Sequence, residues 1–202
     1  MKPFLMLAAS SAMLLSTSFA QEAEDRGLST LSSGTYALDK THGYVTFSYS
    51  HQGYSYPILR FDDVDGVVNF NAGNVTASTL SVDIDPASIN SAVPDFDEHL
   101  VSSDFFDVEN HPEITFSSTS LNLETPYSGT LTGDLTVKGV TKPLTLDVTL
   151  NKAGPNAMKG TEMFGVTATG QLDRRDFDLG LYAPAVGAEV DLRIEAEFML
   201  QE

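Results

Sequence analysis

Apolar and polar residues alternate through Ala188–Leu200, near the end of the chain. Every second position from Val190 to Leu200 is apolar, and most of the positions between them are charged. A period of two is typical of a strand with one face buried and the other face in water. This segment therefore predicts a strand in the wall of an apolar interior.

The same period recurs in several short segments. Among them are Thr35–Asp39, Tyr44–His51, Thr79–Asp85, Thr130–Lys138 and Pro143–Leu150, whereas Ala153–Asn156 reads as a loop. We expect about eight or nine strands in an all-β, antiparallel sheet that closes into a barrel, because closure removes exposed edges. A barrel of about eight strands is wide enough to hold a small ligand.

One segment, residues 87–111, lacks the period of two. Within it, Pro94–Ser102 has helical spacing, with Phe96 and Leu100 four positions apart. Proline suits the first turn of a helix, and the acidic residues that follow suit the positive end of the helix dipole. We expect a short helical insertion, followed by Phe105 and Phe106, that packs at one end of the barrel as a plug.

The first residues of the chain contain one lysine, an apolar run and a small-residue end. This is the pattern of a secretory signal peptide, so we expect residues 1–20 to be cleaved after Ala20 and the protein to reside in the periplasm. Residues 21–33 read as a flexible leader because they are polar and aperiodic. Residues 34–202 have the length of a single domain.

The chain carries 28 acidic and 11 basic residues, a net charge of −17, and no cysteine. Such a protein repels nucleic acid and anionic membrane surfaces, so we expect no nucleic-acid partner. Beyond the signal peptide no stretch is apolar for long enough to give stable membrane anchoring. The absence of cysteine excludes disulfides and thiolate metal sites. The sequence leaves a homodimer open.

Several motifs resemble the YceI family of periplasmic lipid-binding proteins. The most specific is GDLTVKGVTKP at Gly133–Pro143, which follows His99-Leu100, Ser103–Phe106 and His111-Pro112. Other matching positions are Asp39, His42, Val45, Phe47, His51–Ser55, Arg174, Asp176, Phe177 and Glu189-Val190. The resemblance covers Tyr36–Met199, nearly the whole mature chain.

The resemblance implies a lipocalin-like barrel that holds a long-chain isoprenoid or fatty-acid-like amphiphile, such as a polyprenyl quinone. It implies no catalytic residues and no cofactor, so we expect a binding protein and not an enzyme. The expected pocket lining is Phe47, Tyr49, Phe105, Phe106, Phe116, Leu135, Val137, Leu146, Val148 and Ile194. His99 and Arg174 are the candidates for contact with the head group of the ligand.

The sequence departs from the family near the expected mouth of the pocket. Phe96 and Val101 stand where the family often has arginine, and Leu59 and Asp178 stand where it often has glycine. Two missing cations in an acidic chain favour a neutral head group, such as a quinone or an amide, over a pyrophosphate.

Two other functions stay open. A barrel filled by its own side chains would suit an envelope interaction or stress protein without a ligand, and His99 or His111 beside a carboxylate would suit a hydrolase. The four histidines lack a close ligand spacing such as H-E-x-x-H, so we expect no metal site, although His42 and His51 could approach each other across strands. If the pair Arg174-Arg175 does not contact a head group, we expect it to form a salt bridge with an acidic residue.

Overall fold

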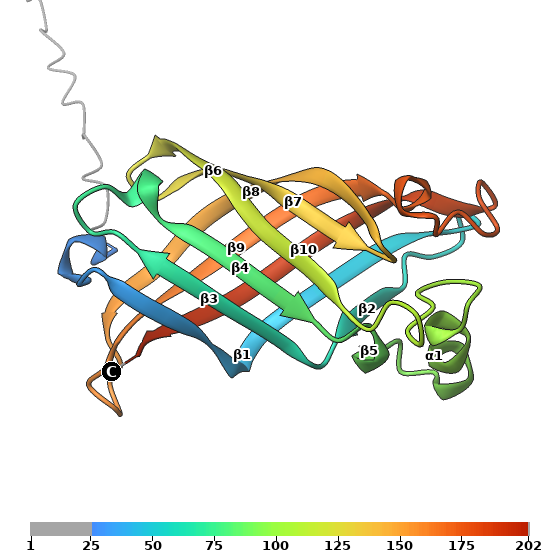
Figure 1. Cartoon of the computed structure of the whole chain (residues 1–202), viewed down its shortest axis with the longest axis horizontal. Helices are drawn as coiled ribbons and strands as arrows, with labels where there is room; N and C mark the ends of the chain where they lie inside the picture. Colours follow the sequence, from blue (N-terminus) through green and yellow to red (C-terminus); the bar gives the residue numbers. More distant parts are fainter. Residues whose placement is uncertain (1–25, 202) are drawn as a thin grey trace, which may run out of the picture.

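The structure, a computed structural model, describes residues 26–201 as a β-barrel (Figure 1). The expected signal peptide and the first residues of the leader lie outside this range. Eight strands form the wall: β1 (Gly34–His51), β3 (Val64–Phe70), β4 (Thr79–Ile84), β6 (Ile114–Thr125), β7 (Ser128–Val137), β8 (Val140–Pro155), β9 (Glu162–Asp173) and β10 (Val186–Leu200). Each strand pairs antiparallel with its neighbours, and β1 closes the circle by pairing with β10. The expected eight-stranded antiparallel barrel is therefore confirmed.

The remaining elements lie at the two ends of the barrel. The α1 end, to the right in Figure 1, carries α1 (Pro94–Val101), the short strands β2 (Ile58–Phe61) and β5 (Ile89–Asn90), and the turn η4 (Arg174–Phe177). The hairpin end carries the short turns η1 (Leu28–Thr30) and η2 (Val75–Ala77), together with the β6–β7 and β8–β9 hairpins. Another turn, η3 (Pro86–Ser88), leads from β4 into β5. Among the described residues no helix has the length and apolar character needed to cross a bilayer.

The strand β1 is continuous over 18 residues, whereas we expected two strands at Thr35–Asp39 and Tyr44–His51. Its first residues pair with β3 and its second half pairs with β2. Between these two parts the register with β10 shifts, and residues 39–42 have no partner in any ladder. We call residues 39–42 the β1 seam.

An ion-pair bridge spans the β1 seam on the outside of the barrel. The ammonium group of Lys40 lies 3.1 Å from a carboxylate oxygen of Asp63 and 2.7 Å from one of Asp65. All three side chains are more than half exposed, so the bridge adds little to the free energy of unfolding. It nevertheless links β1 to β3 where ladder hydrogen bonds are missing.

Two other sequence-based expectations were wrong at the hairpin end. The strand β8 continues to Pro155, through most of the expected loop Ala153–Asn156. Residues 26–33, expected to belong to a flexible leader, pack against this extension. The backbone N–H of Ala153 donates to the carbonyl of Arg26 (2.6 Å), and Leu31 is only 5% exposed.

A cluster of four aromatic rings packs inside the barrel toward the hairpin end. Tyr36 is fully buried, and its ring centroid lies 5.3 Å from that of Phe164 and 5.9 Å from that of Phe70. Phe164 in turn stacks on Phe198 at 5.3 Å. The Tyr36 hydroxyl donates to Glu162 at the start of β9, which satisfies the one polar atom of a buried ring.

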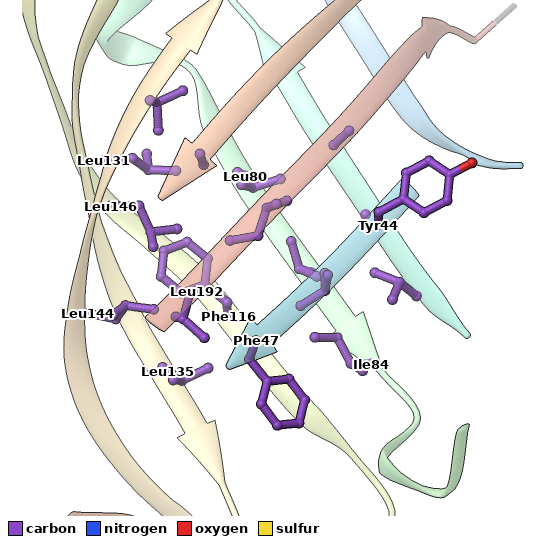
Figure 2. A pocket seen from close by; sticks show the side chains of 18 of the residues that line it. Tyr44, Phe47, Leu80, Ile84, Phe116, Leu131, Leu135, Leu144, Leu146 and Leu192 are labelled. Carbon is purple, nitrogen blue, oxygen red and sulfur yellow. The ribbon is translucent and has the colours of Figure 1, made fainter. Parts of the chain in front are cut away.

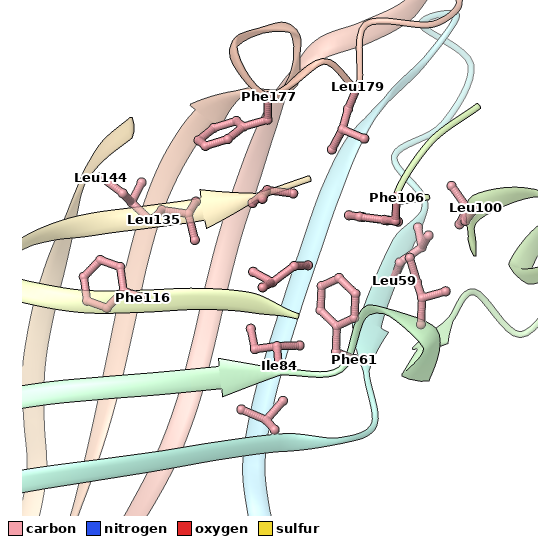
Figure 3. Close-up of a cluster of buried hydrophobic side chains, with 14 of the residues drawn as sticks. Leu59, Phe61, Ile84, Leu100, Phe106, Phe116, Leu135, Leu144, Phe177 and Leu179 are labelled. Atoms are coloured by element: carbon pink, nitrogen blue, oxygen red, sulfur yellow. The ribbon is translucent and has the colours of Figure 1, made fainter. Parts of the chain in front are cut away.

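The α1 end is closed by a second apolar cluster. Figure 3 shows Phe61, Leu100, Phe106 and Phe177 meeting there from β2, α1, the segment after it and η4. Leu59, one of the positions where the family often has glycine, is 1% exposed in the same cluster. The apolar side chains of β2 and β5, strands outside the eight-stranded ring, thus extend the core beyond the rim of the barrel.

The helix α1 forms where the sequence predicts it, and it ends one residue earlier. Proline occupies its first turn, and the Ser102 hydroxyl donates to the carbonyl of His99 (2.6 Å) at its end. Leu100 and Phe106 are buried, and Phe96 and Phe105 pack against the same cluster. The expected plug of apolar side chains at one barrel end is therefore confirmed.

Phe106→Ala should lower the free energy of unfolding by roughly 3–5 kcal/mol, because it empties a buried site that the surrounding rings cannot fill. Urea denaturation followed by circular dichroism measures this loss. Tyr54→Ala, at an 88% exposed ring of the same barrel end, is the control and should change stability by less than about 0.5 kcal/mol. A loss below about 1 kcal/mol for Phe106→Ala would contradict the plug.

Candidate functional site

An apolar cavity of about 550 Å³ lies inside the barrel. This volume falls within the range of roughly 300–1,000 Å³ that is usual for small-molecule sites. Inward-facing positions of all eight strands contribute to its wall, and α1 and the segments beside it contribute at one end. In Figure 2, Leu80, Leu131, Leu146 and Leu192 project into it from four different strands.

The cavity exists because the inward side chains are too small to meet across the barrel. The middle of the wall is built from leucine, valine, isoleucine and alanine, and the large aromatic rings concentrate toward the two ends. Glycines also face inward: a Cβ atom at Gly133 would approach the Phe116 ring to 2.4 Å, so the ring lies flat against the wall. The space along the barrel axis stays open.

All ten residues expected to line a pocket lie in the wall of this cavity. They are Phe47, Tyr49, Phe105, Phe106, Phe116, Leu135, Val137, Leu146, Val148 and Ile194. The period of two was sufficient to identify those on strands, because the face of each strand that avoids water also faces the cavity. Their contact with a ligand stays a prediction.

The sequence-based list missed the contribution of β3 and β4 to the wall. Val64, Val68, Leu80 and Val82 line the cavity, as do Phe164 and Phe198 at its far end. The alternation in Thr79–Asp85 was the available signal for the residues of β4.

Five polar side chains line the cavity at the α1 end: Tyr49, His51, His99, Arg174 and Tyr182. The hydroxyls of Tyr49 and Tyr182 and the rings of His51 and His99 make no hydrogen bond to any other described residue. Burial raises the pKa of the Tyr49 hydroxyl, so this group stays neutral and available as a donor. The α1 end therefore offers unused hydrogen-bonding groups at the edge of an apolar space.

Arg174, the second expected head-group contact, also lines the cavity, but its donors are already used. The side chain is 8% exposed, and its guanidinium donates to the carbonyls of Leu179, Leu181, Val186 and Gly187. Four of its five N–H groups are thus engaged, with the loop that follows η4 and with the first residues of β10. Burial also lowers the pKa of this arginine. Its main role is to hold that loop in place.

The other cations near this end are paired as well. Lys138 is 11% exposed, and its ammonium lies 3.4 Å from an Asp178 carboxylate oxygen and 3.4 Å from the carbonyl of Ser103. It thereby ties the segment after α1 to the loop after η4. Arg175 forms the expected salt bridge, with Asp173. Arg174 is the only lysine or arginine among the described residues of the cavity wall.

The two positions where the family often has arginine, Phe96 and Val101, have apolar surroundings in the structure. Phe96 lies in the cavity wall, and Val101 packs against the core cluster of the α1 end. Neither position adds charge to the cavity.

One group of side chains on the outside of the barrel could hold a divalent cation. Asp39, His42 and Glu197 bring one ligand atom each within 4.8 Å of one another, beside the β1 seam. Asp39 also accepts hydrogen bonds from Thr41, and these bonds lower its pKa to about 2. The nearest charge partner of His42 is Asp39, at 3.1 Å, and not His51 as considered from the sequence. A hydrogen bond of 3.1 Å between the His42 ring and Asp39 already occupies two of these groups.

Neither histidine considered for hydrolysis has a carboxylate beside it. Within residues 26–201, His99 and His111 make no ion pair, and the closest aromatic neighbour of the His99 ring is Phe105 at 5.0 Å. The His111 ring lies against Gly139, so closely that a Cβ atom there would come within 2.9 Å of it. A general base of the histidine–carboxylate type needs hydrogen-bond contact between the two groups, which is lacking here.

Comparison with known proteins places this barrel in a family. Residues 36–198 match the model of the YceI-like domain. The chain belongs to the YceI-like family. A UPF0312 protein of Pseudomonas putida is 38% identical over 170 residues, which cover 83% of this chain and 87% of the relative.

Solved structures of this YceI-like fold support the architecture. BcnA of Burkholderia cenocepacia superposes with a TM-score of 0.72 at 20% identity, over 79% of this chain and 98% of BcnA. A domain of Saccharophagus degradans, described as polyisoprenoid-binding and implicated in plant cell wall breakdown, superposes with a TM-score of 0.61 at 14% identity. That match covers 82% of this chain and 98% of the domain, and at such identities both matches show the fold alone.

Arg174→Met should destabilise the barrel by about 2–4 kcal/mol, because it leaves several buried carbonyls without a donor. Urea denaturation measures the change in free energy, and hydrogen exchange should show faster exchange across residues 179–187. Arg175→Met is the matched control, since the neighbouring side chain is exposed and only its salt bridge is lost. Equal stability of the two variants would show that the carbonyl contacts of Arg174 are unimportant.

Proposed function

We propose that this YceI-like protein binds a long-chain isoprenoid, or a fatty-acid-like amphiphile, inside its barrel and carries it through water. The observation that supports this function is the apolar cavity of about 550 Å³. Each buried CH₂ group of a ligand contributes roughly 0.8 kcal/mol, so a five-carbon isoprene unit contributes about 4 kcal/mol. An apolar tail can therefore bind tightly without polar contacts.

The ligand lies along the barrel with its head group at the α1 end. The tail occupies the middle of the cavity, between the leucine and valine side chains of the strands. The head group reaches Tyr49, His99 and Tyr182, whose polar atoms have no other hydrogen-bond partner among the described residues. An unsatisfied polar group at the edge of an apolar space gains most from a ligand that completes its hydrogen bonds.

The head group is neutral, such as a quinone carbonyl or an amide. A pyrophosphate needs several cations, and the only arginine in the described cavity wall already donates to four carbonyls. Tyrosine and neutral histidine suit a carbonyl oxygen because they donate hydrogen bonds without charge. The net charge of −17 further disfavours an anion.

The proposal includes a binding role without catalysis and a periplasmic location. The lack of a histidine–carboxylate pair at His99 or His111 favours binding over hydrolysis. A cavity of this size disfavours the alternative of an interaction protein with a filled barrel. The description of the Saccharophagus degradans domain as polyisoprenoid-binding agrees with the proposed ligand class.

Protein purified without detergent should release a long-chain lipid into organic solvent, and mass spectrometry of the extract identifies it. Val148→Phe projects a larger ring into the cavity and should reduce lipid recovery and the affinity for an added polyprenyl quinone by at least tenfold. Thr145→Phe is the matched control, because this exposed position on the same strand points outward. Equal lipid content in the two variants would contradict an occupant inside the barrel.

A polyprenyl quinone should bind more tightly than a polyprenyl pyrophosphate of equal chain length, at low and at moderate salt. Tyr49→Phe should weaken quinone binding about three- to tenfold, the effect of one neutral hydrogen bond. Tyr44→Phe is the control, since this cavity residue already donates its hydroxyl hydrogen to the Thr41 carbonyl. Tighter binding of the pyrophosphate at both salt concentrations would show that the assignment of the head group is wrong.

A further inference from the structure

Exposed apolar side chains gather at the α1 end of the barrel. Within residues 26–201, ten large apolar side chains are exposed, and six of them belong to this end. We call these six the apolar collar: Tyr54, Tyr56, Ile58, Val93, Leu181 and Tyr182. Their exposed fractions range from 38% to 88%.

The collar is carried by segments that project beyond the barrel rim. Tyr54 and Tyr56 lie in the turn after β1, and Leu181 and Tyr182 lie in the loop after η4, both at the right of Figure 1. The two segments are adjacent, because His51 pairs with Val186. No described residue covers the Tyr54 ring, which is 88% exposed.

The collar borders the proposed head-group end of the cavity. Tyr182 belongs to both, since it is 57% exposed and also lines the cavity. Its ring centroid lies 6.4 Å from that of His99 and 6.3 Å from that of Phe105. A lipid that moves between the cavity and the outside at this end would therefore pass the collar.

Negatively charged side chains near the apolar collar limit the kind of lipid surface that can contact it. Asp95, Glu98 and Asp104 are exposed at the α1 end and form no ion pair with a described residue. The nearby cations Lys138 and Arg175 are already paired with aspartates. The surface therefore repels anionic lipid, and its free carboxylates complement the ammonium groups that zwitterionic phospholipids present to water.

We propose that the apolar collar docks reversibly on the surface of a zwitterionic phospholipid bilayer, where it loads or releases the ligand. Tyrosine is favoured at membrane–water interfaces because its ring is apolar and its hydroxyl stays hydrated. Tyrosine faces also attract the ammonium groups of choline and ethanolamine lipids. This inference rests on the proposed lipid-binding function, and a few exposed side chains give peripheral contact without stable anchoring.

Co-sedimentation with phosphatidylcholine and phosphatidylethanolamine vesicles tests the docking, using the full mature chain. The variant Tyr54→Ser/Tyr56→Ser/Ile58→Thr should lower the bound fraction at least fivefold, while its circular dichroism and melting temperature stay as in the parent. Met158→Ser is the matched control, since Met158 is 90% exposed in the β8–β9 hairpin at the opposite end. It should bind vesicles as the parent does.

A second measurement separates docking from ligand binding. Polyprenyl quinone added from ethanol should bind the triple variant with unchanged affinity, whereas transfer of quinone from vesicles to this variant should be at least fivefold slower. Quinone binding without any vesicle binding by the parent would overturn the docking and leave the ligand proposal intact. Failure to bind quinone from ethanol would overturn the ligand proposal itself.

Two further outcomes would also overturn the inference. If 20% phosphatidylglycerol in the vesicles strengthened binding, the charge argument would be wrong. If light scattering showed a dimer that the triple variant converts to a monomer, the collar would be an interface between two copies of this chain. Weaker binding to the anionic vesicles and a monomeric parent are the expected results.

Discussion

Closure of the sheet through the pairing of β1 with β10 is the constraint on which the rest of the structure depends. β1 begins the described barrel and β10 ends it, so the circle closes only when the two ends of the domain meet. Closure fixes the inward face of every strand at once, because a slip of one residue would turn apolar side chains toward water. The cavity, the two end clusters and the collar all take their positions from this register.

Side chains fill part of the barrel interior and leave a cavity in the rest. Aromatic rings around Tyr36 pack toward the hairpin end, and the cluster around Phe106 packs at the α1 end. The smaller aliphatic side chains between them leave about 550 Å³ unfilled. The open space thus lies between two packed clusters, in the middle of the barrel. At the α1 end, Tyr49 and His99 face the cavity with polar atoms that have no partner among the described residues.

The fold and most of the cavity wall could be predicted from the sequence, because both follow from one alternating pattern. The continuity of β1 could not, since its polar residues 39–42 lie in no ladder and interrupt the alternation. The extension of β8 through Ala153 and Gly154 was also missed, because such small residues carry little strand signal. The role of Arg174 depends on the path of residues 179–187, and the arginine alone does not reveal that its donors are already used. The absence of a free cation in the described cavity wall thus required the structure.

The β1 seam affects how far the circumference of the barrel can change. Where a ladder is continuous, widening the barrel would break several backbone hydrogen bonds together. At residues 39–42 only the side-chain bridge of Lys40 spans the gap to β3. Local opening is easiest where backbone hydrogen bonds are fewest, so the wall opens readily along this line. Such a line lets the circumference of the barrel change without a slip in the register of the strands.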